Sequence, residues 1–129
     1  MIGLDTGFFI KLLRNDLQAT KVFESTHDDT DLCVSCLTFF ELKRLSLKGA
    51  VEQNAIDTLI ESILSLCRIS WLDNKEIHDI AASLSYGLGI PAIDSLILAG
   101  FISNGSETIY TTDPHMGKYT KKGVQVIKL

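Results

Sequence analysis

The sequence lacks an apolar run long enough to cross a membrane. The best candidate, Ser95 to Ile102, is far shorter than the roughly 20 apolar residues that a bilayer requires. The start of the chain also lacks the uninterrupted apolar segment of a secretion signal, because Asp5 falls where that segment would begin. These two absences predict a cytoplasmic protein that has no membrane partner.

Cysteine is scarce, and its number is odd. Three residues, Cys33, Cys36 and Cys67, do not make complete pairs, so we expect no disulfide framework and a reducing compartment. Cys33-Val-Ser-Cys36 has the spacing of half a zinc site, but no second pair accompanies it. If both lie in one strand, residues three apart point to opposite faces, so we expect core packing rather than a metal or redox site.

Positive charge is scarce as well. The chain has 12 basic and 16 acidic residues and a net charge of −4, which argues against binding nucleic acid mainly by counterion release. A nuclease is not excluded, because bound divalent cations can supply positive charge where a phosphate lies. One basic stretch with an aromatic residue, Lys118 to Lys122, is either a solvated loop or a contact for RNA.

The sequence does contain short apolar strands that alternate with segments of helical period. Its 129 residues are enough for one domain, spanning residues 1–129. Alternating strands and helices predict an α/β fold with a mainly parallel sheet covered on both faces. The expected strands are residues 2–4, 32–35, 68–72, 108–111 and 124–129.

Three helices have recognisable boundaries. The first runs from Gln53 to Leu66 and has one apolar stripe, consisting of Ile56, Leu59, Ile60, Ile63 and Leu64. The second begins at Asp73, which forms a capping-box-like pair with Glu76, and ends near Gly87 and Gly89. The third has Pro91 at its first position and stops at Asn104-Gly105.

Four acidic residues lie among apolar neighbours, where a carboxylate is costly unless a cation or hydrogen-bond donors compensate it. Other acids, such as Asp28, Asp29 and Asp31 in a polar loop with His27 and Thr30, are expected to be solvated. The four exceptions are Asp5, Glu41, Asp94 and Asp113. They are either a functional cluster or acids satisfied by helix caps and buried pairs elsewhere in the fold.

The placement of the four acids favours a metal site. Asp5 and Asp113 follow strands, and ligands of open α/β sheets bind beyond the carboxyl ends of the strands. Asp94 falls in the first turn after Pro91, where the helix dipole favours an anion. A ligand set of oxygens alone selects a hard cation, Mg²⁺ or Mn²⁺, which can activate water at a phosphoryl centre.

Four segments together resemble the PIN-domain family, especially its VapC-type toxin ribonucleases. They are Leu4-Asp-Thr-Gly-Phe-Phe-Ile10, Ser35 to Glu41, Gly89-Ile-Pro-Ala-Ile-Asp-Ser-Leu-Ile-Leu-Ala99 and Thr111-Thr-Asp113. The resemblance implies a five-stranded sheet of order 3-2-1-4-5, with Asp5 and Asp113 on adjacent strands. It also implies Mg²⁺-dependent cleavage of RNA by a metal-activated water, an antitoxin protein as partner, and a homodimer.

The resemblance also implies roles for individual residues. Asp5 and Asp94 resemble the principal metal ligands, Glu41 would bind a second ion or orient the water, and Asp113 would complete the site. Thr6 and Thr112 match small polar positions that hold the acids by hydrogen bonds. Family members often have an aromatic residue in a D-x-x-F-like run after the last acid, whereas this chain has Asp113-Pro-His-Met116.

Two other functions remain open. An acidic pocket on a doubly wound sheet also occurs in receiver domains and aspartyl-phosphate phosphatases, but Gly7 stands where the phosphatases have a second Asp, and the third strand runs into Trp71-Leu72-Asp73. The other alternative is a non-catalytic PIN-like scaffold that binds RNA or protein. His115, beside Asp113, would either touch a substrate phosphate or simply be exposed.

Overall fold

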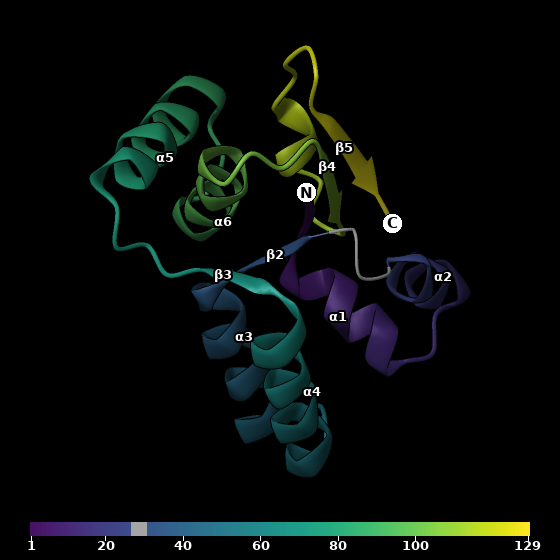
Figure 1. Ribbon diagram of the computed structural model, residues 1–129. Coiled ribbons are helices and arrows are strands. Elements are labelled where there is room, and N and C mark those ends of the chain that lie inside the picture. The colour runs from purple at the N-terminus through teal and green to yellow at the C-terminus, as the bar shows by residue number, and fades with distance from the viewer. Residues whose placement is uncertain (27–30) are drawn as a thin grey trace.

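The computed structural model describes residues 1–26 and 31–129 and contains one five-stranded sheet (Figure 1). Every pair of neighbouring strands is parallel, and their order is β3-β2-β1-β4-β5, which confirms the predicted fold class and strand order. The strands are β1 (Ile2–Leu4), β2 (Leu32–Ser35), β3 (Arg68–Ser70), β4 (Thr108–Thr111) and β5 (Gln125–Lys128). The sequence predicted that Asp28, Asp29 and Asp31 are solvated. Asp28 and Asp29 lie outside the described residues, and Asp31 is exposed.

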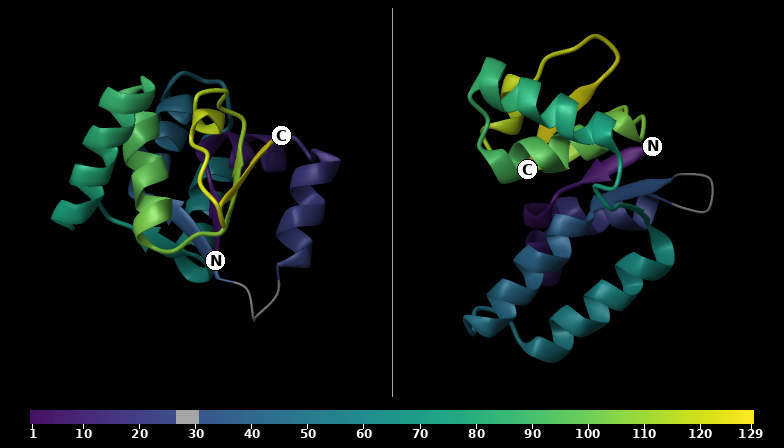
Figure 2. Two further views of the ribbon diagram at one scale, coloured as in Figure 1. Left: turned by 90° about the horizontal axis from the view of Figure 1, so that it is seen from above. Right: turned by 90° about the vertical axis from the view of Figure 1, so that its left-hand side faces the viewer.

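The helices cover both faces of the sheet, as Figures 1 and 2 show. On one face α5 and α6 pack with Ile109 and Met116, and on the other α1 to α4 pack against Leu4, Leu32 and Val34. The helices are α1 (Thr6–Leu13), α2 (Leu17–Ser25), α3 (Cys36–Leu47), α4 (Gln53–Leu66), α5 (Lys75–Leu88) and α6 (Ala92–Ser103), and a 3₁₀ turn, η1, spans Met116–Lys118.

Helix α4 has the predicted bounds, but its apolar stripe is narrower than predicted. Ile56 and Ile63 are buried, whereas Leu64 is 51% exposed and does not belong to the stripe. Leu64 directly follows Ile63, so its side chain is rotated away from the sheet.

The starts of α5 and α6 each differ from the prediction by one residue. Asn74, and not Asp73, caps α5, because the Asn74 side chain accepts the backbone N–H of Glu76 at 2.9 Å. Pro91 is the N-cap of α6, since its carbonyl accepts the Ser95 N–H at 2.8 Å and begins the helical ladder. Gly89, with φ of +66°, ends α5 as predicted.

Strands β3 and β5 are shorter than predicted, and the cysteine motif is divided between two elements. β3 stops at Ser70, and Leu72 has a positive φ of 63°, which takes the chain out of the strand conformation. Cys36 begins α3, so the argument that both cysteines of the motif lie in one strand was wrong. Cys33 is buried in the core, where burial raises the pKa of its thiol to about 11. Cys33, Cys36 and Cys67 are all free.

The chain reverses its direction of travel across the sheet between β1 and β4. From β1 it passes through helices on one face to β2 and β3, and then returns through α5 and α6 on the other face to β4. In an open parallel sheet, this switch point leaves a crevice at the carboxyl ends of the two central strands. Asp5 follows β1 directly and Asp113 lies two residues beyond β4, so both lie at this crevice.

Within the described ranges, no helix is both long enough and apolar enough to cross a membrane.

Candidate active site

Asp5 is fixed by three donors at the end of β1. It is the N-cap of α1, and its Oδ1 accepts the backbone N–H of Phe8 at 2.9 Å. Its Oδ2 accepts the hydroxyl of Thr111 and the backbone N–H of Thr112 at 3.3 Å. Burial raises the pKa of Asp5 above its ordinary value, although these hydrogen bonds oppose the shift. Asp5 therefore ties α1 to the end of β4.

Glu41 is positioned by a chain of two threonine hydroxyls. Thr6 donates to Glu41 Oε1 at 2.7 Å, and Thr6 and Thr38 are 2.9 Å apart through their hydroxyl oxygens. An ionised carboxylate has no proton to give, so the single proton of Thr6 goes to Glu41 and Thr38 donates to Thr6. These two hydrogen bonds join α3 to α1. In the part of the chain that the structure describes, the other carboxylate oxygen of Glu41 accepts no hydrogen bond, so it could bind a water or an ion.

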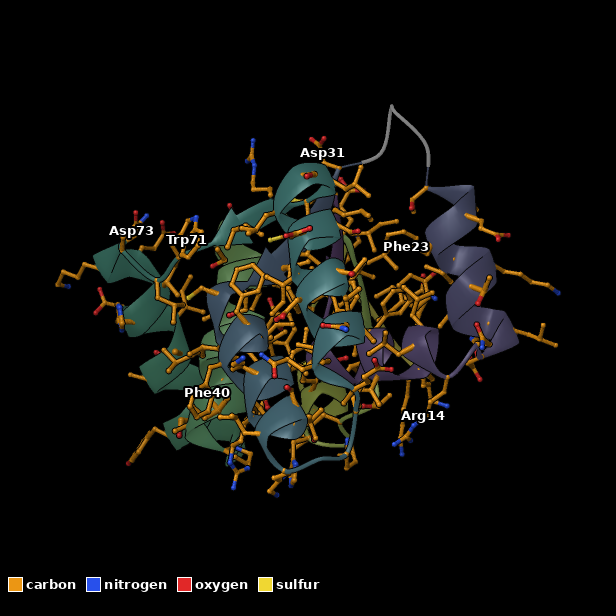
Figure 3. The ribbon with its side chains drawn as sticks, turned by 90° about the horizontal axis from the view of Figure 1, so that it is seen from below. Arg14, Phe23, Asp31, Phe40, Trp71 and Asp73 are labelled. Carbon is orange, nitrogen blue, oxygen red and sulfur yellow. The ribbon has the colours of Figure 1, made fainter. Side chains whose placement is uncertain are left out.

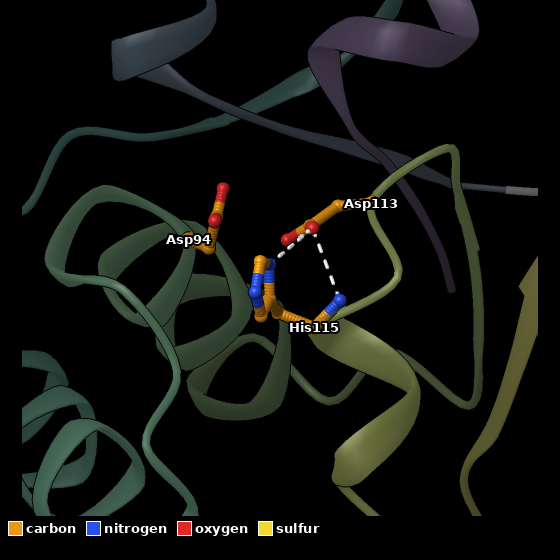
Figure 4. A group of neighbouring side chains, drawn as sticks. All are labelled: Asp94, Asp113 and His115. Atoms are coloured by element: carbon orange, nitrogen blue, oxygen red, sulfur yellow. Dashed lines mark hydrogen bonds and ion pairs between the residues drawn. The ribbon is translucent and has the colours of Figure 1, made fainter.

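Asp113 is oriented by His115, as Figure 4 shows. Its Oδ1 accepts both the backbone N–H of His115 at 3.0 Å and the ring Nδ1 at 2.9 Å. Its Oδ2 is buried and has no hydrogen-bond partner in the described part of the chain. Burial disfavours the charged form, but the hydrogen bonds from His115, together with the proton that Asp94 can share, outweigh it and lower the pKa of Asp113.

Asp94 lies in the first turn of α6 and faces Asp113. Ligand atoms of Asp94, Asp113 and His115 lie within 4.8 Å of one another. Burial, then the carboxylate of Asp113 and the charge of Glu41, raise the pKa of Asp94 to about 6. An Asp94 that holds its proton donates it to Asp113, and an ionised Asp94 faces a second carboxylate with no donor between them.

The four acids predicted from the sequence lie at one end of the sheet. Asp94 and Asp113 face each other, Glu41 lines a pocket with Asp94, and the charge of Asp113 acts on Asp5. Asp73, which a receiver domain would use, is exposed in the loop after the edge strand β3.

The structure adds Thr111 to the site and gives Thr112 and His115 specific contacts there. Thr111 is fully buried and donates to Asp5, and only its position directly before Thr112 and Asp113 pointed to it. Thr112 contributes its backbone N–H. His115 belongs to the acid group, with its side chain 43% exposed. Three residues after Asp113, where relatives often have an aromatic, Met116 is buried in the core.

The residues present fit a divalent cation. Asp113 Oδ2 is a buried carboxylate oxygen without a donor, and it faces a second carboxylate whose pKa is raised. Carboxylate oxygens are ligands for Mg²⁺ and Mn²⁺. The sequence predicted oxygen ligands alone, whereas a ring nitrogen of His115 also lies in this group. Asp94 and Asp113 would hold such an ion, with Glu41 and Asp5 beside them.

Comparison with known proteins gives one family match. A family model described as "PIN domain" matches residues 2–122. The search of curated proteins found no match.

Similar folds occur in solved toxin–antitoxin structures. A toxin–antitoxin complex from Klebsiella pneumoniae is 19% identical with a TM-score of 0.75, covering 99% of this chain and 97% of that one. VapBC2 from Rickettsia felis, bound to a DNA fragment from its promoter, is 14% identical with a TM-score of 0.77, covering 100% and 99%. The Mycobacterium tuberculosis toxin VapC20, described as cleaving the sarcin–ricin loop, is 16% identical with a TM-score of 0.70, covering 97% and 99%. At these identities the likeness supports the fold.

Proposed function

The chain belongs to the PIN-domain family, and from this membership we propose that it is a ribonuclease that cleaves RNA phosphodiester bonds with Mg²⁺, or Mn²⁺, as cofactor. The observation that carries the proposal is the buried, donor-free Oδ2 of Asp113 opposite Asp94. Two such carboxylates repel each other unless a proton or a cation lies between them. A cation at this point would be next to a pocket open to a substrate.

Asp5, Glu41, Asp94 and Asp113 have separate tasks in this proposal. When bound, such an ion would supply a polarised water and charge stabilisation at the phosphoryl group. The resemblance implied Asp5 and Asp94 as the principal ligands, but both oxygens of Asp5 already accept hydrogen bonds. In this proposal Asp94 and Asp113 would therefore hold the ion, and Asp5 fixes the end of β4 that leads to Asp113. Glu41, fixed by Thr6, orients the attacking water or a second ion with its free oxygen.

We further propose that the protein is the toxin of a toxin–antitoxin pair and acts on RNA in the cytoplasm. The support is the fold shared with the toxin–antitoxin structures from Klebsiella pneumoniae and Rickettsia felis. Large exposed apolar side chains, such as Tyr86 at 96% and Leu47 at 77%, are suited to contacts with an antitoxin or with a second copy in a homodimer. Growth arrest by the chain, relieved by co-expression of a neighbouring reading frame, tests this role. Equal arrest by Asp94→Asn would contradict it.

A cleavage assay on purified protein tests the enzymatic proposal. We expect cleavage of RNA with Mg²⁺ or Mn²⁺, none after chelation, and none by Asp94→Asn. The matched control is Asp57→Asn, which changes an exposed acid on α4 and should leave cleavage unchanged. Cleavage that survives chelation would disprove the metal mechanism. RNA binding without cleavage would favour the non-catalytic scaffold.

A further inference from the structure

A pocket of about 330 Å³ extends from the acid group along α3. Glu41 of α3 and Asp94 of α6 line one part of it, and Arg44 of α3 and Lys48, the C-cap residue of α3, line another. The remaining lining residues are Thr6, Ile10, Phe40, Leu45 and Ile93. The pocket therefore combines two acids of the candidate site, two cations and an apolar wall.

The two cations follow Glu41 along one side of α3. Arg44 is three residues and Lys48 seven residues after Glu41, and residues at these spacings share a helix face. With a rise of about 1.5 Å per residue, Arg44 lies about 4.5 Å and Lys48 about 10 Å farther along the helix axis. The positive charges of Arg44 and Lys48 thus lie on the side of Glu41 that faces the C-terminus of α3.

Among the described residues, neither cation forms an ion pair with an acid. The ion pairs among the described residues involve Lys11, Lys75 and His115, and none involves Arg44 or Lys48, both of which are exposed. Cations near the C-terminus of a helix interact favourably with the helix dipole, so the positions of Arg44 and Lys48 at the end of α3 also have a structural explanation. That explanation does not account for their lining the same pocket as Glu41 and Asp94.

The apolar wall includes an exposed aromatic ring. Phe40 of α3 is 62% exposed, and its side chain is labelled in Figure 3. Ile93, one residue before Asp94, is 41% exposed and also lines the pocket. Exposed aromatic rings beside a cationic track are a common arrangement for binding single-stranded nucleic acid, because a base stacks on the ring.

We infer that this pocket binds the single-stranded part of the RNA next to the scissile phosphate. Arg44 and Lys48 contact backbone phosphates on that side, and Phe40 stacks against a base. The orientation, with the scissile phosphate at Asp94 and Asp113, rests on the proposed ribonuclease function. The pocket gives an acidic protein two local cations for a polyanionic substrate.

Fluorescence anisotropy with a short, labelled, single-stranded oligoribonucleotide of mixed sequence tests the inference. An Asp94→Asn background prevents cleavage during the measurement. Adding Arg44→Gln and Lys48→Gln should weaken binding on the order of tenfold for each cation. The slope of log K against log salt should become shallower by about 1.4, since each lost phosphate contact on a single strand contributes about 0.7.

Two control variants separate contact from general charge. Lys43→Gln removes an exposed cation one residue away on α3 that does not line the pocket, and it should leave the salt slope unchanged. Arg44→Lys keeps the charge and should restore most of the slope. Equal effects of Lys43→Gln and Arg44→Gln would overturn the inference, because only net charge would then matter.

The outcomes also separate this inference from the ribonuclease proposal. If binding depends on Arg44 and Lys48 but wild-type protein never cleaves RNA, the binding site stands and the enzymatic proposal fails. If wild-type protein cleaves RNA and the double variant binds with unchanged affinity and slope, the inference is wrong. If Phe40→Ala changes the molecular mass in sedimentation equilibrium and leaves RNA affinity unchanged, Phe40 belongs to a contact between two copies and the stacking role is overturned.

Discussion

The carboxylates of Asp94 and Asp113 lie within 4.8 Å of each other, and Asp113 Oδ2 has no donor among the described residues. The two acids come from different elements, the first turn of α6 and the segment after β4. His115 uses only Oδ1 of Asp113, so it directs the other oxygen toward Asp94 without neutralising it. The pair therefore requires either a proton or a cation.

The metal-free protein should become more stable when Asp94 is neutralised. Folding raises the pKa of Asp94 from 3.8 to about 6, so the folded state binds the proton more tightly than the unfolded state. The stability that this proton contributes is present at low pH and is lost as pH rises from about 4 to about 6. Asp94→Asn should therefore stabilise the chelated protein at pH 7.5, by about 1 kcal/mol after allowing for solvent screening.

Urea denaturation in chelator at pH 5 and pH 7.5 measures this effect. The gain from Asp94→Asn should be larger at pH 7.5 than at pH 5. Asp57→Asn, at an exposed position, should show no such difference. A variant less stable than wild type at both pH values would mean that donors within the fold compensate Asp94.

Adding Mg²⁺ should reverse this ranking. A ligand at about 100 times its dissociation constant stabilises the folded state by roughly 2.7 kcal/mol. In thermal melts, Mg²⁺ should raise the melting temperature of the wild-type protein. It should raise that of Asp94→Asn much less, because this variant has lost a ligand charge. Equal shifts in both proteins would place the ion elsewhere.

The positions of the strands and the unusual setting of the four acids could be predicted from the sequence because these signals are local, whereas the strand order came from the family resemblance. Gly3 to Leu4 and Val34 to Ser35 are buried in short apolar strands, and the acids stand out against such neighbours. Helix ends were less predictable. Asp73 and Asn74 are both good N-caps, and only the backbone path after Leu72 decides which side chain reaches Glu76.

Contacts between distant segments could not be read from the sequence. Asp5 and Thr111 are 106 residues apart, and Thr6 and Glu41 meet only because α1 and α3 pack together. The role of His115 depends on the shape of the loop after β4. The basic stretch from Lys118 to Lys122 was also hard to place. Lys118 and Tyr119 line a pocket with α5, which is not the pocket that Glu41 and Asp94 line. The proposed contact of this stretch with RNA stays a prediction.

His115 should set metal affinity through Asp113. His115→Phe removes the ring hydrogen bond to Asp113 Oδ1 and keeps an aromatic ring. Loss of such a supporting contact typically weakens a metal site by 10- to 100-fold, so we expect about a tenfold rise in the Mn²⁺ dissociation constant by calorimetry. His115→Asn, whose amide can replace the Nδ1 donor, should recover part of the loss. No change in either variant would show that the backbone N–H of His115 alone orients Asp113.

Asp5 should respond to neutralisation in the opposite way to Asp94. Its Oδ2 accepts two donors, and an amide group at that position would confront the Thr112 N–H with another donor. Asp5→Asn should therefore destabilise the metal-free protein by about 1–3 kcal/mol. Thr111→Val, which removes one of these donors, should act in the same direction. Thr108→Val on the same strand is the control, and stabilisation by Asp5→Asn would show that repulsion among the acids dominates at Asp5 as well.

Gly7 should be as necessary to the site as the acids, for a steric reason. It lies in the first turn of α1, and a Cβ added there would collide with Thr112 Oγ1 and lie 2.8 Å from Thr112 Cβ. This close approach places the N-terminus of α1, and with it Asp5, against the segment that leads to Asp113.

Gly7→Ala should push the end of β4 away from α1. An Ala in a helix is otherwise favourable, so a loss of stability can be attributed to the collision. We expect a loss of about 1–3 kcal/mol in urea denaturation, typical of overpacking, together with a lower Mg²⁺ affinity because Asp113 is displaced.

A second substitution shows whether contact with Thr112 is the cause. Thr112→Ala removes Oγ1 and Cγ2, two of the three atoms that the new Cβ would meet, and leaves the backbone N–H that Asp5 accepts. The double variant should therefore recover part of both stability and Mg²⁺ affinity. The matched control is Gly87→Ala in α5, where an added Cβ meets nothing within 4 Å and should be neutral or stabilising. If Gly7→Ala is tolerated, or if Thr112→Ala fails to restore it, the spacing between Asp5 and Asp113 does not depend on this glycine.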